Sequence, residues 1–175
     1  YEHPDLLGNT WLNQDEIPDN GVDDDQNGYI DDLHGWDFVN DDNNPSDYSS
    51  SGHGTHVAGT IAASGNNNQG VTGVMWRAQI MALQVLDFNG ATTSSFSLVN
   101  AIDYAINNGA RIINMSLGGS GFSTADYQII ELANQKGVLI IAAAGNGGED
   151  SIGDDNDFMP TYPASYNLPN IISVA

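Results

Sequence analysis

The sequence has no cysteine and only 3 lysine and arginine residues among 175. Without cysteine the protein cannot form disulfide bonds, thiolate metal sites or a cysteine nucleophile. Because so few bases oppose 23 acidic residues, the formal net charge is −20 at pH 7. A surface of this sign repels phosphate backbones and anionic lipid headgroups at long range. We therefore expect neither nucleic acid nor a membrane surface as a partner.

Long apolar runs are also missing. No segment approaches the roughly 18 apolar residues that a membrane-spanning helix needs, and no signal peptide is visible. The sequence begins with Tyr1 rather than methionine, so we expect the true N-terminus, and any export signal, to lie outside it. A hydrophobic fraction of 40% is too high for a disordered acidic tail, and the length suits a folded domain with a core.

The acidic residues are concentrated in two segments. Fourteen of the 23 lie between Glu2 and Asp47, and five lie between Glu149 and Asp157. No lysine or arginine occurs before Arg77, so the first segment contains no basic side chain of its own. The second segment has two interpretations: a pocket rim that favours basic substrate residues, or a solvated surface loop.

Residues 1–52 are rich in Asp, Asn and Gly, which predicts long loops with little periodic structure. After them, helical and apolar strand patterns alternate along the chain. Strands that are apolar on both faces and separated by helices predict a parallel sheet covered on both sides. The expected fold is therefore one α/β domain of three layers, a doubly wound, mostly parallel sheet with helices on both faces. We expect helices at residues 53–64, from Ser94 or Ser95 to 108, and at 123–136, and strands at 80–86, 112–115, 138–144 and from Ile171.

Three short motifs stand where such a fold collects its functional residues. Residues 51–60 read Ser-Gly-His-Gly-Thr-His-Val-Ala-Gly-Thr and place His53 at a helix start, between glycines that allow close approach. Residues 114–119 read Asn-Met-Ser-Leu-Gly-Gly and end a strand in two glycines. Residues 142–147 read Ala-Ala-Ala-Gly-Asn-Gly and place the amide of Asn146 just past another strand.

In this order, the three motifs resemble those of the subtilisin-like serine proteases, the subtilase family, and the resemblance extends over essentially the whole chain. It implies a serine endopeptidase in which His53 is the general base and Asn146 donates a hydrogen bond to the oxyanion. It also implies that the substrate peptide pairs, as an added strand, with the backbone of Ser116, Leu117, Gly118 and Gly119. The other wall of the primary specificity pocket would be lined by Ala143, Ala144 and Gly145.

The comparison with the family also indicates what the sequence lacks. The catalytic aspartate of subtilases lies in an Asp-Ser/Thr-Gly motif a few residues before a His-Pro-Asp-Leu stretch, which is here residues 3–6. Their nucleophile lies in a Gly-Thr-Ser-Met-Ala motif beyond the last strand, and no Gly-Thr-Ser occurs in this sequence. We therefore expect residues 1–175 to be a catalytic domain truncated at both ends and inactive alone. The alternative is a calcium-binding pseudoprotease, an interaction module that kept the fold without the nucleophile.

The first acidic segment contains the opening of a calcium loop. Residues 23–32 space oxygen ligands two residues apart and then turn on a glycine. The EF-hand pattern would require Glu where the chain has His34, so the loop is not an EF-hand. Five aspartates in ten residues repel one another, and a divalent cation relieves that repulsion; a solvated loop without metal is the alternative. The expected ligands are Asp23, Asp25 and Asn27, the carbonyl of Tyr29, and either Asp31 or Asp32.

Two further calcium sites are implied by the resemblance alone. In subtilases the aspartate of the His-Pro-Asp-Leu stretch, here Asp5, binds calcium together with a loop that follows the active-site helix. That loop would contribute the side chain of Asn67 and carbonyls near Gly65, Gln69 and Val71. In some members another site lies before the histidine, and it could be built here by Asp37, Asn40, Asp42 and Asn44.

Two other features of the sequence, a pair of histidines and a Tyr-Pro pair, each allow two interpretations. His53 and His56 lie three residues apart and could share a zinc ion, although we expect His56 to pack within the fold. The pair Tyr162-Pro163 is either the cis-proline turn of the family's pocket rim or an ordinary loop. The floor of the pocket depends on residues around Thr161, so the cleavage preference stays open. Altogether we expect a secreted, monomeric protease with structural Ca²⁺ that acts on polypeptide substrates.

Overall fold

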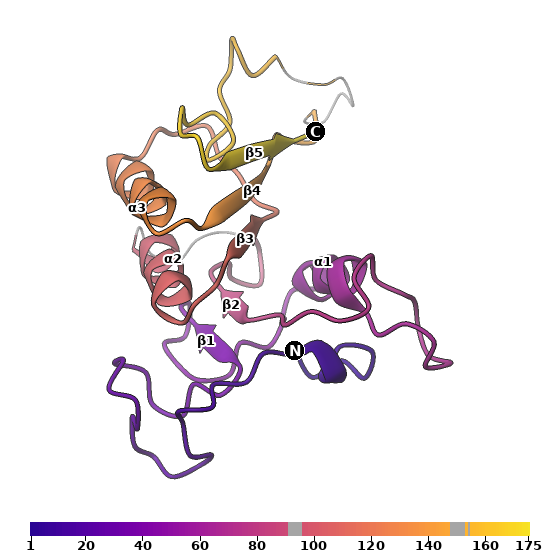
Figure 1. Cartoon of the computed structure of the whole chain (residues 1–175). Helices are drawn as coiled ribbons and strands as arrows, with labels where there is room; N and C mark the ends of the chain where they lie inside the picture. Colours follow the sequence, from indigo (N-terminus) through magenta and orange to yellow (C-terminus); the bar gives the residue numbers. More distant parts are fainter. Residues whose placement is uncertain (91–95, 148–152, 154) are drawn as a thin grey trace. The chain divides into compact units, whose positions relative to one another are not determined.

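The computed structural model describes residues 1–90, 96–147, 153 and 155–175 (Figure 1). The chain forms two compact units, residues 1–101 and 102–175. Every strand pairing is parallel: β1 pairs with β2 in the first unit, and β4 lies between β3 and β5 in the second. The elements are η1 (Leu7–Asn9), β1 (Gly35–Asp37), α1 (His53–Ala62), β2 (Ala82–Gln84), α2 (Ser97–Asn107), β3 (Ile112–Met115), α3 (Thr124–Gln135), β4 (Leu139–Ala143) and β5 (Ile171–Val174).

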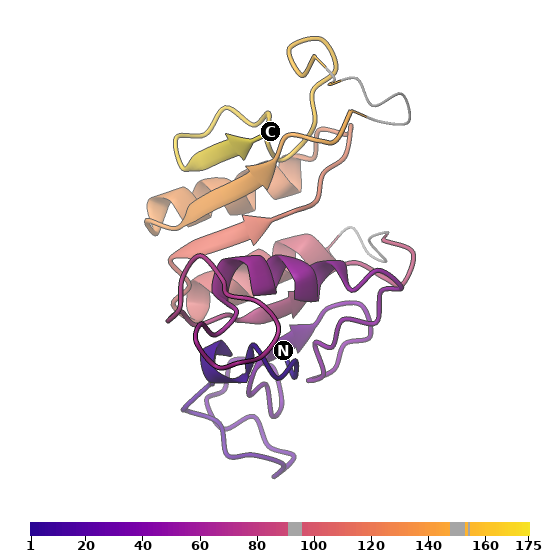
Figure 2. The ribbon, with the colours of Figure 1, turned by 90° about the vertical axis from the view of Figure 1, so that its right-hand side faces the viewer.

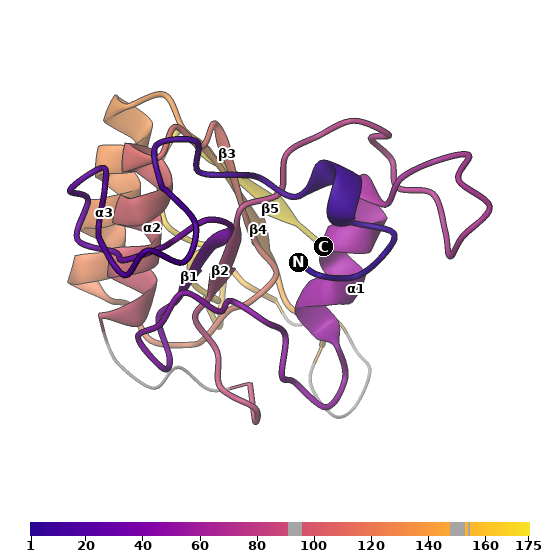
Figure 3. The same cartoon turned by 90° about the horizontal axis from the view of Figure 1, so that it is seen from below.

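The first unit is built around a short parallel strand pair and the helix that begins at His53. β1 and β2 pair with Gly35 opposite Ala82. The 3-10 helix η1 lies beside α1 (Figure 3), because the buried Asn9 donates through Nδ2 to the carbonyls of Ala62 at 2.8 Å and Trp76 at 3.2 Å. Residues from the start of the chain therefore hold the end of α1 and the segment that follows it.

Carboxylates occupy much of the interior of the first unit. A buried carboxylate is unfavourable unless hydrogen bonds or a counter-charge replace its water. Here the N–H groups of loops are donors: Asp37 Oδ1 accepts from Val39 at 2.7 Å and from Asn40 at 3.0 Å. The described residues of this unit bury the apolar side chains of Leu6, Trp36, Ala62, Ala63 and Ala101, and the acidic side chains of Asp5, Glu16, Asp31, Asp32 and Asp37.

The second unit is a three-stranded parallel sheet with a helix against it. Figure 2 shows β3, β4 and β5 running in the same direction, and α3 packs against β4. Ser123 caps α3, since its Oγ accepts the N–H of Asp126 at 3.2 Å. Along β4 the side chains of Ile140 and Ala142 are buried. The buried residues of α3 are Ile129 and Ile130, with Ala133 four and three residues further on, the spacing of one helical core face.

These elements confirm the α/β class and the order of helices and strands expected from the sequence. Residues 1–52, expected to form loops, contain only η1 and β1 as regular elements. β2 is shorter than the strand expected at 80–86, because Ile80 forms an isolated bridge instead of continuing it. The predicted helix caps Ser94 and Ser95 lie outside the described residues. None of the helices in the described ranges has the length and apolar character that crossing a membrane requires.

The close approach of β1 to β2 depends on Gly35. Its φ is +124°, and a Cβ added there would lie 1.9 Å from the carbonyl oxygen of Ala82. We expect Gly35→Ala to lower the free energy of unfolding by about 3 kcal/mol or more, because backbone strain adds to the clash. Gly90→Ala is the control, since Gly90 has a φ of +79° but open space around an added Cβ. Urea unfolding measures both, and equal losses would contradict the close approach.

Candidate functional site

His53 is the first residue of α1, and its side chain is exposed. Gly52 before it has φ 60° and ψ 33°, a left-handed conformation that suits glycine. The expectation that His56 packs within the fold is wrong: His56 is exposed, because residues three apart share one helix face and this face is open. In the described part of the chain, no third His, Asp or Glu joins these two histidines in a metal-binding group, so the zinc alternative gains no support.

Two of the motifs lie next to each other in the second unit. Residues 116–119 follow β3 and residues 144–146 follow β4, and these two strands are paired neighbours. A Cβ added to Gly118 would lie 3.8 Å from the carbonyl oxygen of Ala143. The two segments that the resemblance assigns to the walls of a substrate pocket are therefore adjacent at the carboxyl ends of β3 and β4.

The turn at Tyr162-Pro163 reaches the same region, and its peptide bond is cis. Gly119 and Tyr162 exchange two backbone hydrogen bonds, at 2.8 and 2.9 Å, so the backbone of Gly119 is already paired. A Cβ on Gly118 would lie 2.9 Å from Cγ2 of Thr161, so Thr161 borders the expected pairing edge. Thr161 was expected at the pocket floor, whereas the pairing of Tyr162 with Gly119 was not expected, although the Tyr-Pro dipeptide is a signal for a turn there.

Asn146 is exposed and stands between two glycines with positive φ, beyond the end of β4. Ala144 is held from both sides: its N–H donates to β5 at 2.7 Å, and its carbonyl accepts from Nδ2 of Asn156 at 2.8 Å. The contact of Asn156 with Ala144 was not expected from the sequence, because a single amide side chain in a loop forms no periodic pattern. Residues 148–152 and 154, which carry three of the five acids of the second acidic segment, lie outside the described residues. Both interpretations of that segment therefore stand.

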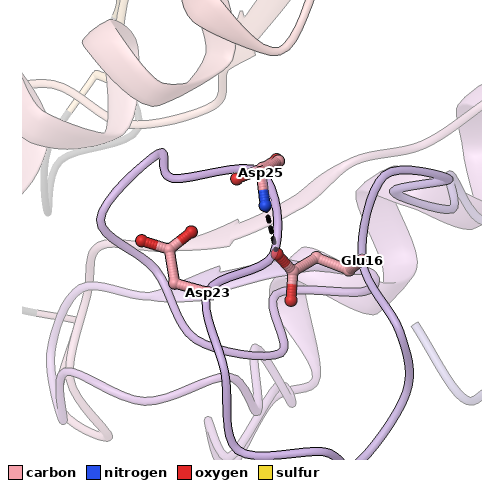
Figure 4. A group of neighbouring side chains, drawn as sticks. All are labelled: Glu16, Asp23 and Asp25. Carbon is pink, nitrogen blue, oxygen red and sulfur yellow. Dashed lines mark hydrogen bonds between the residues drawn. The ribbon is translucent and has the colours of Figure 1, made fainter.

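The first acidic segment gathers three carboxylates, those of Glu16, Asp23 and Asp25, with oxygens within 4.8 Å of one another (Figure 4). Glu16 is buried, and the other two are half-buried. Negative charges this close repel one another, and an all-oxygen donor set is the one that Ca²⁺ takes. Within the described ranges this is the one group of three or more such side chains placed to hold a metal ion.

Glu16 was not among the predicted ligands, because it precedes the stretch in which the two-residue spacing is visible. Its carboxylate also orders that stretch. Oε1 accepts the N–H groups of Asp24 at 2.8 Å and Asp25 at 3.2 Å, and Oε2 accepts the N–H of Asp31 at 3.1 Å. One buried carboxylate therefore binds the backbone near both ends of the loop.

Two amide side chains lie among the remaining predicted ligands. Asn27 donates through Nδ2 to Asp25 at 3.0 Å and to Asp32 at 2.9 Å, and through its N–H to Asp23 at 3.0 Å. Asn13 donates to Asp25 at 3.0 Å and to Asp32 at 2.8 Å. The structure therefore brings Asp23, Asp25, Asn27 and Asp32 together around one point of the loop.

Asp31, the other candidate for the last calcium ligand, contacts a different part of the first acidic segment. Its two carboxylate oxygens accept the N–H groups of Asn20 at 3.1 Å and Gly21 at 2.9 Å. The N–H of Tyr29 donates to Oδ1 of Asn27 at 2.8 Å, which places Tyr29 beside the group. Of the two alternatives that the sequence left open, Asp32 is the one that lies with the other predicted ligands.

The expected long-range contact between Asp5 and the loop after α1 is present. The buried Asp5 accepts from Nδ2 of Asn67 at 2.6 Å through Oδ1, and from the N–H of Val71 at 2.9 Å through Oδ2. The Asn67 amide, together with the Val71 N–H, holds the pKa of Asp5 below its ordinary value of 3.8. The stability that these bonds contribute is therefore present above that value and is lost as the pH falls below it.

The residues implied for a site near Asp37 lie in one turn without gathering their carboxylates. Asp37 and Asp42 exchange backbone hydrogen bonds at 2.9 and 3.2 Å. The buried carboxylate of Asp37 accepts from Nδ2 of Asn40 at 2.8 Å, whereas the exposed one of Asp42 accepts the N–H of Asn44 at 3.0 Å. Together with the bonds from the N–H groups of Val39 and Asn40 to Asp37, these bonds order the turn.

Comparison with known proteins gives a consistent result. The family model described as "Subtilase family" matches residues 1–175. Thermitase of Thermoactinomyces vulgaris is 41% identical over 143 residues, which cover 82% of this chain and 47% of thermitase. The thermostable alkaline protease of Halalkalibacterium halodurans is 44% identical over 123 residues, covering 70% and 31%. The solved structure of sphericase matches with a TM-score of 0.70 and 34% identity, covering 99% of this chain and 49% of that one.

The chain therefore spans about half the length, or less, of the proteins it matches. The likeness to solved structures of this family confirms the expected subtilisin-like α/β fold.

The three hydrogen bonds that Glu16 accepts should contribute to the stability of the folded protein. Glu16→Gln keeps the shape of the side chain but leaves one acceptor oxygen for three N–H donors and turns an NH₂ group toward one of them. We expect a loss of about 1–3 kcal/mol in the free energy of unfolding, measured by urea titration with a chelator present. Asp19→Asn removes the same charge from an exposed position of the same segment and should change stability little. Equal losses in the two variants would contradict the role of Glu16.

Proposed function

The chain belongs to the subtilase family, and on that premise we propose that the protein containing it is a serine endopeptidase, a hydrolase of peptide bonds in polypeptides. The observation that carries the proposal is an exposed His53 at the start of α1, together with paired strands β3 and β4 that end in adjacent glycine-containing segments. The protease named among the relatives favours a peptidase over the calcium-binding interaction module.

We propose that residues 1–175 are the central part of the catalytic domain. Of a Ser-His-Asp triad, they contain the histidine, and the segments with the aspartate and the serine belong to the longer protein. The match to 47% of thermitase supports this division. The chain alone should not hydrolyse peptides, because a general base without its nucleophile has nothing to activate.

His53 is the general base in this proposal. An imidazole exchanges protons near neutral pH, so it can take the proton of the serine hydroxyl during attack on the scissile carbonyl. The same proton then passes to the leaving amine. The exposed position of His53 leaves its ring open to the nucleophile and the substrate.

Asn146 donates its amide N–H to the oxyanion of the tetrahedral intermediate. In subtilisin itself, the loss of this kind of donor costs roughly 2.7–4 kcal/mol of transition-state stabilisation. The substrate backbone pairs with residues 116–118, because Gly119 is held by Tyr162. Residues 143–145 form the opposite wall of the pocket.

Calcium is the proposed structural cofactor, and the donor set fits it. Carboxylates at Glu16, Asp23 and Asp25 with no sulfur or nitrogen ligand favour a hard cation. Asp32 and the Asn27 side chain complete the oxygen set with the carbonyl of Tyr29. The ion would neutralise the repulsion of the cluster and take no part in the chemistry.

Asp5 with Asn67, and Asp37 with Asp42, are proposed as further calcium positions. The first is supported by the contact of Asp5 with the loop after α1, and the second by the shared turn. We also propose that the protein is monomeric and extracellular, because calcium sites of extracellular modules fill at the high free calcium found there.

The role of His53 is tested by His53→Ala in the full-length protein. We expect kcat to fall by roughly 10⁶-fold, a magnitude that comes from subtilisin itself, because the serine loses its proton acceptor. Peptide hydrolysis under saturating substrate gives the measurement. His56→Ala, one turn further on the same exposed face, is the control and should keep most of the activity. An active His53→Ala variant would remove His53 from the mechanism.

The calcium site is tested by thermal unfolding with excess Ca²⁺ and with a chelator. Calcium at about 100 times its Kd should stabilise the protein by about 2.7 kcal/mol, since it binds only the folded loop. Asp25→Asn and Asp32→Asn should each reduce this gain, because each removes a charged ligand. Asp19→Asn should keep it. An equal gain in all four proteins would place the calcium elsewhere.

A further inference from the structure

The backbone N–H groups in the first turn of α1 find no hydrogen-bond acceptors within the helix. The first four N–H groups of any α-helix have no partner within the helix. The residue at the cap position, Gly52, has no side chain that could accept these groups, and its carbonyl accepts the N–H of His56 at 2.9 Å. The remaining donors of the turn, which begins with His53, need acceptors from other residues.

Asp47 and Ser49 provide two of these acceptors. Oδ2 of Asp47 accepts the N–H of Thr55 at 2.8 Å. Oδ1 accepts both the N–H of Ser49, at 3.1 Å, and its hydroxyl, at 2.5 Å. Oγ of Ser49 in turn accepts the N–H of His53 at 3.3 Å. A continuous series of hydrogen bonds therefore links the backbone of His53, through Ser49 and Asp47, to the backbone of Thr55.

The charge of Asp47 suits this position, because the N-terminal end of a helix attracts an anion. Burial raises the pKa of Asp47, but the hydrogen bonds from Ser49 and Thr55 outweigh it and hold the pKa below its ordinary value. A Cβ added to Gly54 would lie 3.5 Å from Oδ2, an ordinary contact, so the carboxylate lies directly against the first turn. Asp47 is therefore an ionised cap six residues before the histidine.

We propose that Asp47 is a positioning residue for catalysis, which fixes the first turn of α1 and thereby the direction of the His53 side chain. This inference rests on the proposed role of His53 as the general base. Asp47 is distinct from the triad aspartate of the family, because its carboxylate accepts the N–H and hydroxyl of Ser49 and the N–H of Thr55. A displacement of about 1 Å in a catalytic group can reduce the rate by about 10²-fold.

Steady-state kinetics of the full-length protein test the proposal. We expect Asp47→Ala to lower kcat by about 10- to 100-fold with KM unchanged within about twofold, because orientation is lost and substrate contacts are not. Asp47→Asn keeps an oxygen for the N–H of Thr55 and should recover most of kcat. Asp103→Ala, an exposed acid of α2, is the control and should match the wild type. An unchanged kcat in Asp47→Ala, or a rise in KM alone, overturns the proposal.

Amide hydrogen exchange of the chain itself adds a readout that needs no activity. In Asp47→Ala the N–H of Thr55 should exchange at least about tenfold faster, while that of Ile140, bonded to Asn170 in the second unit, should not change. Unchanged exchange at Thr55 overturns the proposal. A wild-type protein without peptidase activity overturns the serine endopeptidase function and the role of Asp47 with it. An active wild type with an equally active Asp47→Ala variant overturns only the role of Asp47.

Discussion

Carboxylates bound by backbone N–H groups are the interaction on which the first unit depends. Its loops form few regular hydrogen bonds, so their donors need other acceptors. Glu16, Asp31 and Asp37 each accept two or more N–H groups from such loops. The sequence contains no basic residue before Arg77, so these carboxylates take donors from the main chain. An acidic, loop-rich segment therefore becomes ordered without a large apolar core.

The same interaction separates two uses of the acidic residues. Where N–H donors surround a carboxylate, as at Asp5 and Asp47, the charge orders a loop or a helix start. Asp23 and Asp25 also accept backbone N–H groups, but they lie beside the carboxylate of Glu16, so repulsion remains and a cation is the natural partner. The large negative charge is thus divided between structural acceptors and a candidate metal position.

The sequence predicts best those elements that carry a periodic pattern or a cap. The amphipathic pattern over residues 123–136 predicts α3, and the continuously apolar run over 138–144 predicts β4. Glu16 and Asp47 were missed, because the partners of Glu16 lie eight or more residues away and Thr55, which Asp47 caps, lies eight residues away, so no local pattern links them. The contact of Asp5 with Asn67 spans 62 residues and was expected only through the family resemblance. The exposure of His56 was mispredicted, because the pattern of α1 does not show which of its faces is covered.

The hydrogen bonds between Asp5 and the loop after α1 can form only late during synthesis on the ribosome. Asp5 emerges 66 residues before its partner Val71, and β1 must wait for β2 in the same way. At roughly 5–20 residues per second, Asp5 waits on the order of 3 to 13 s for the N–H of Val71. During that time the charges of the first acidic segment keep it solvated and apart from other chains. The acidity that later orders the unit thus also protects it before it can fold.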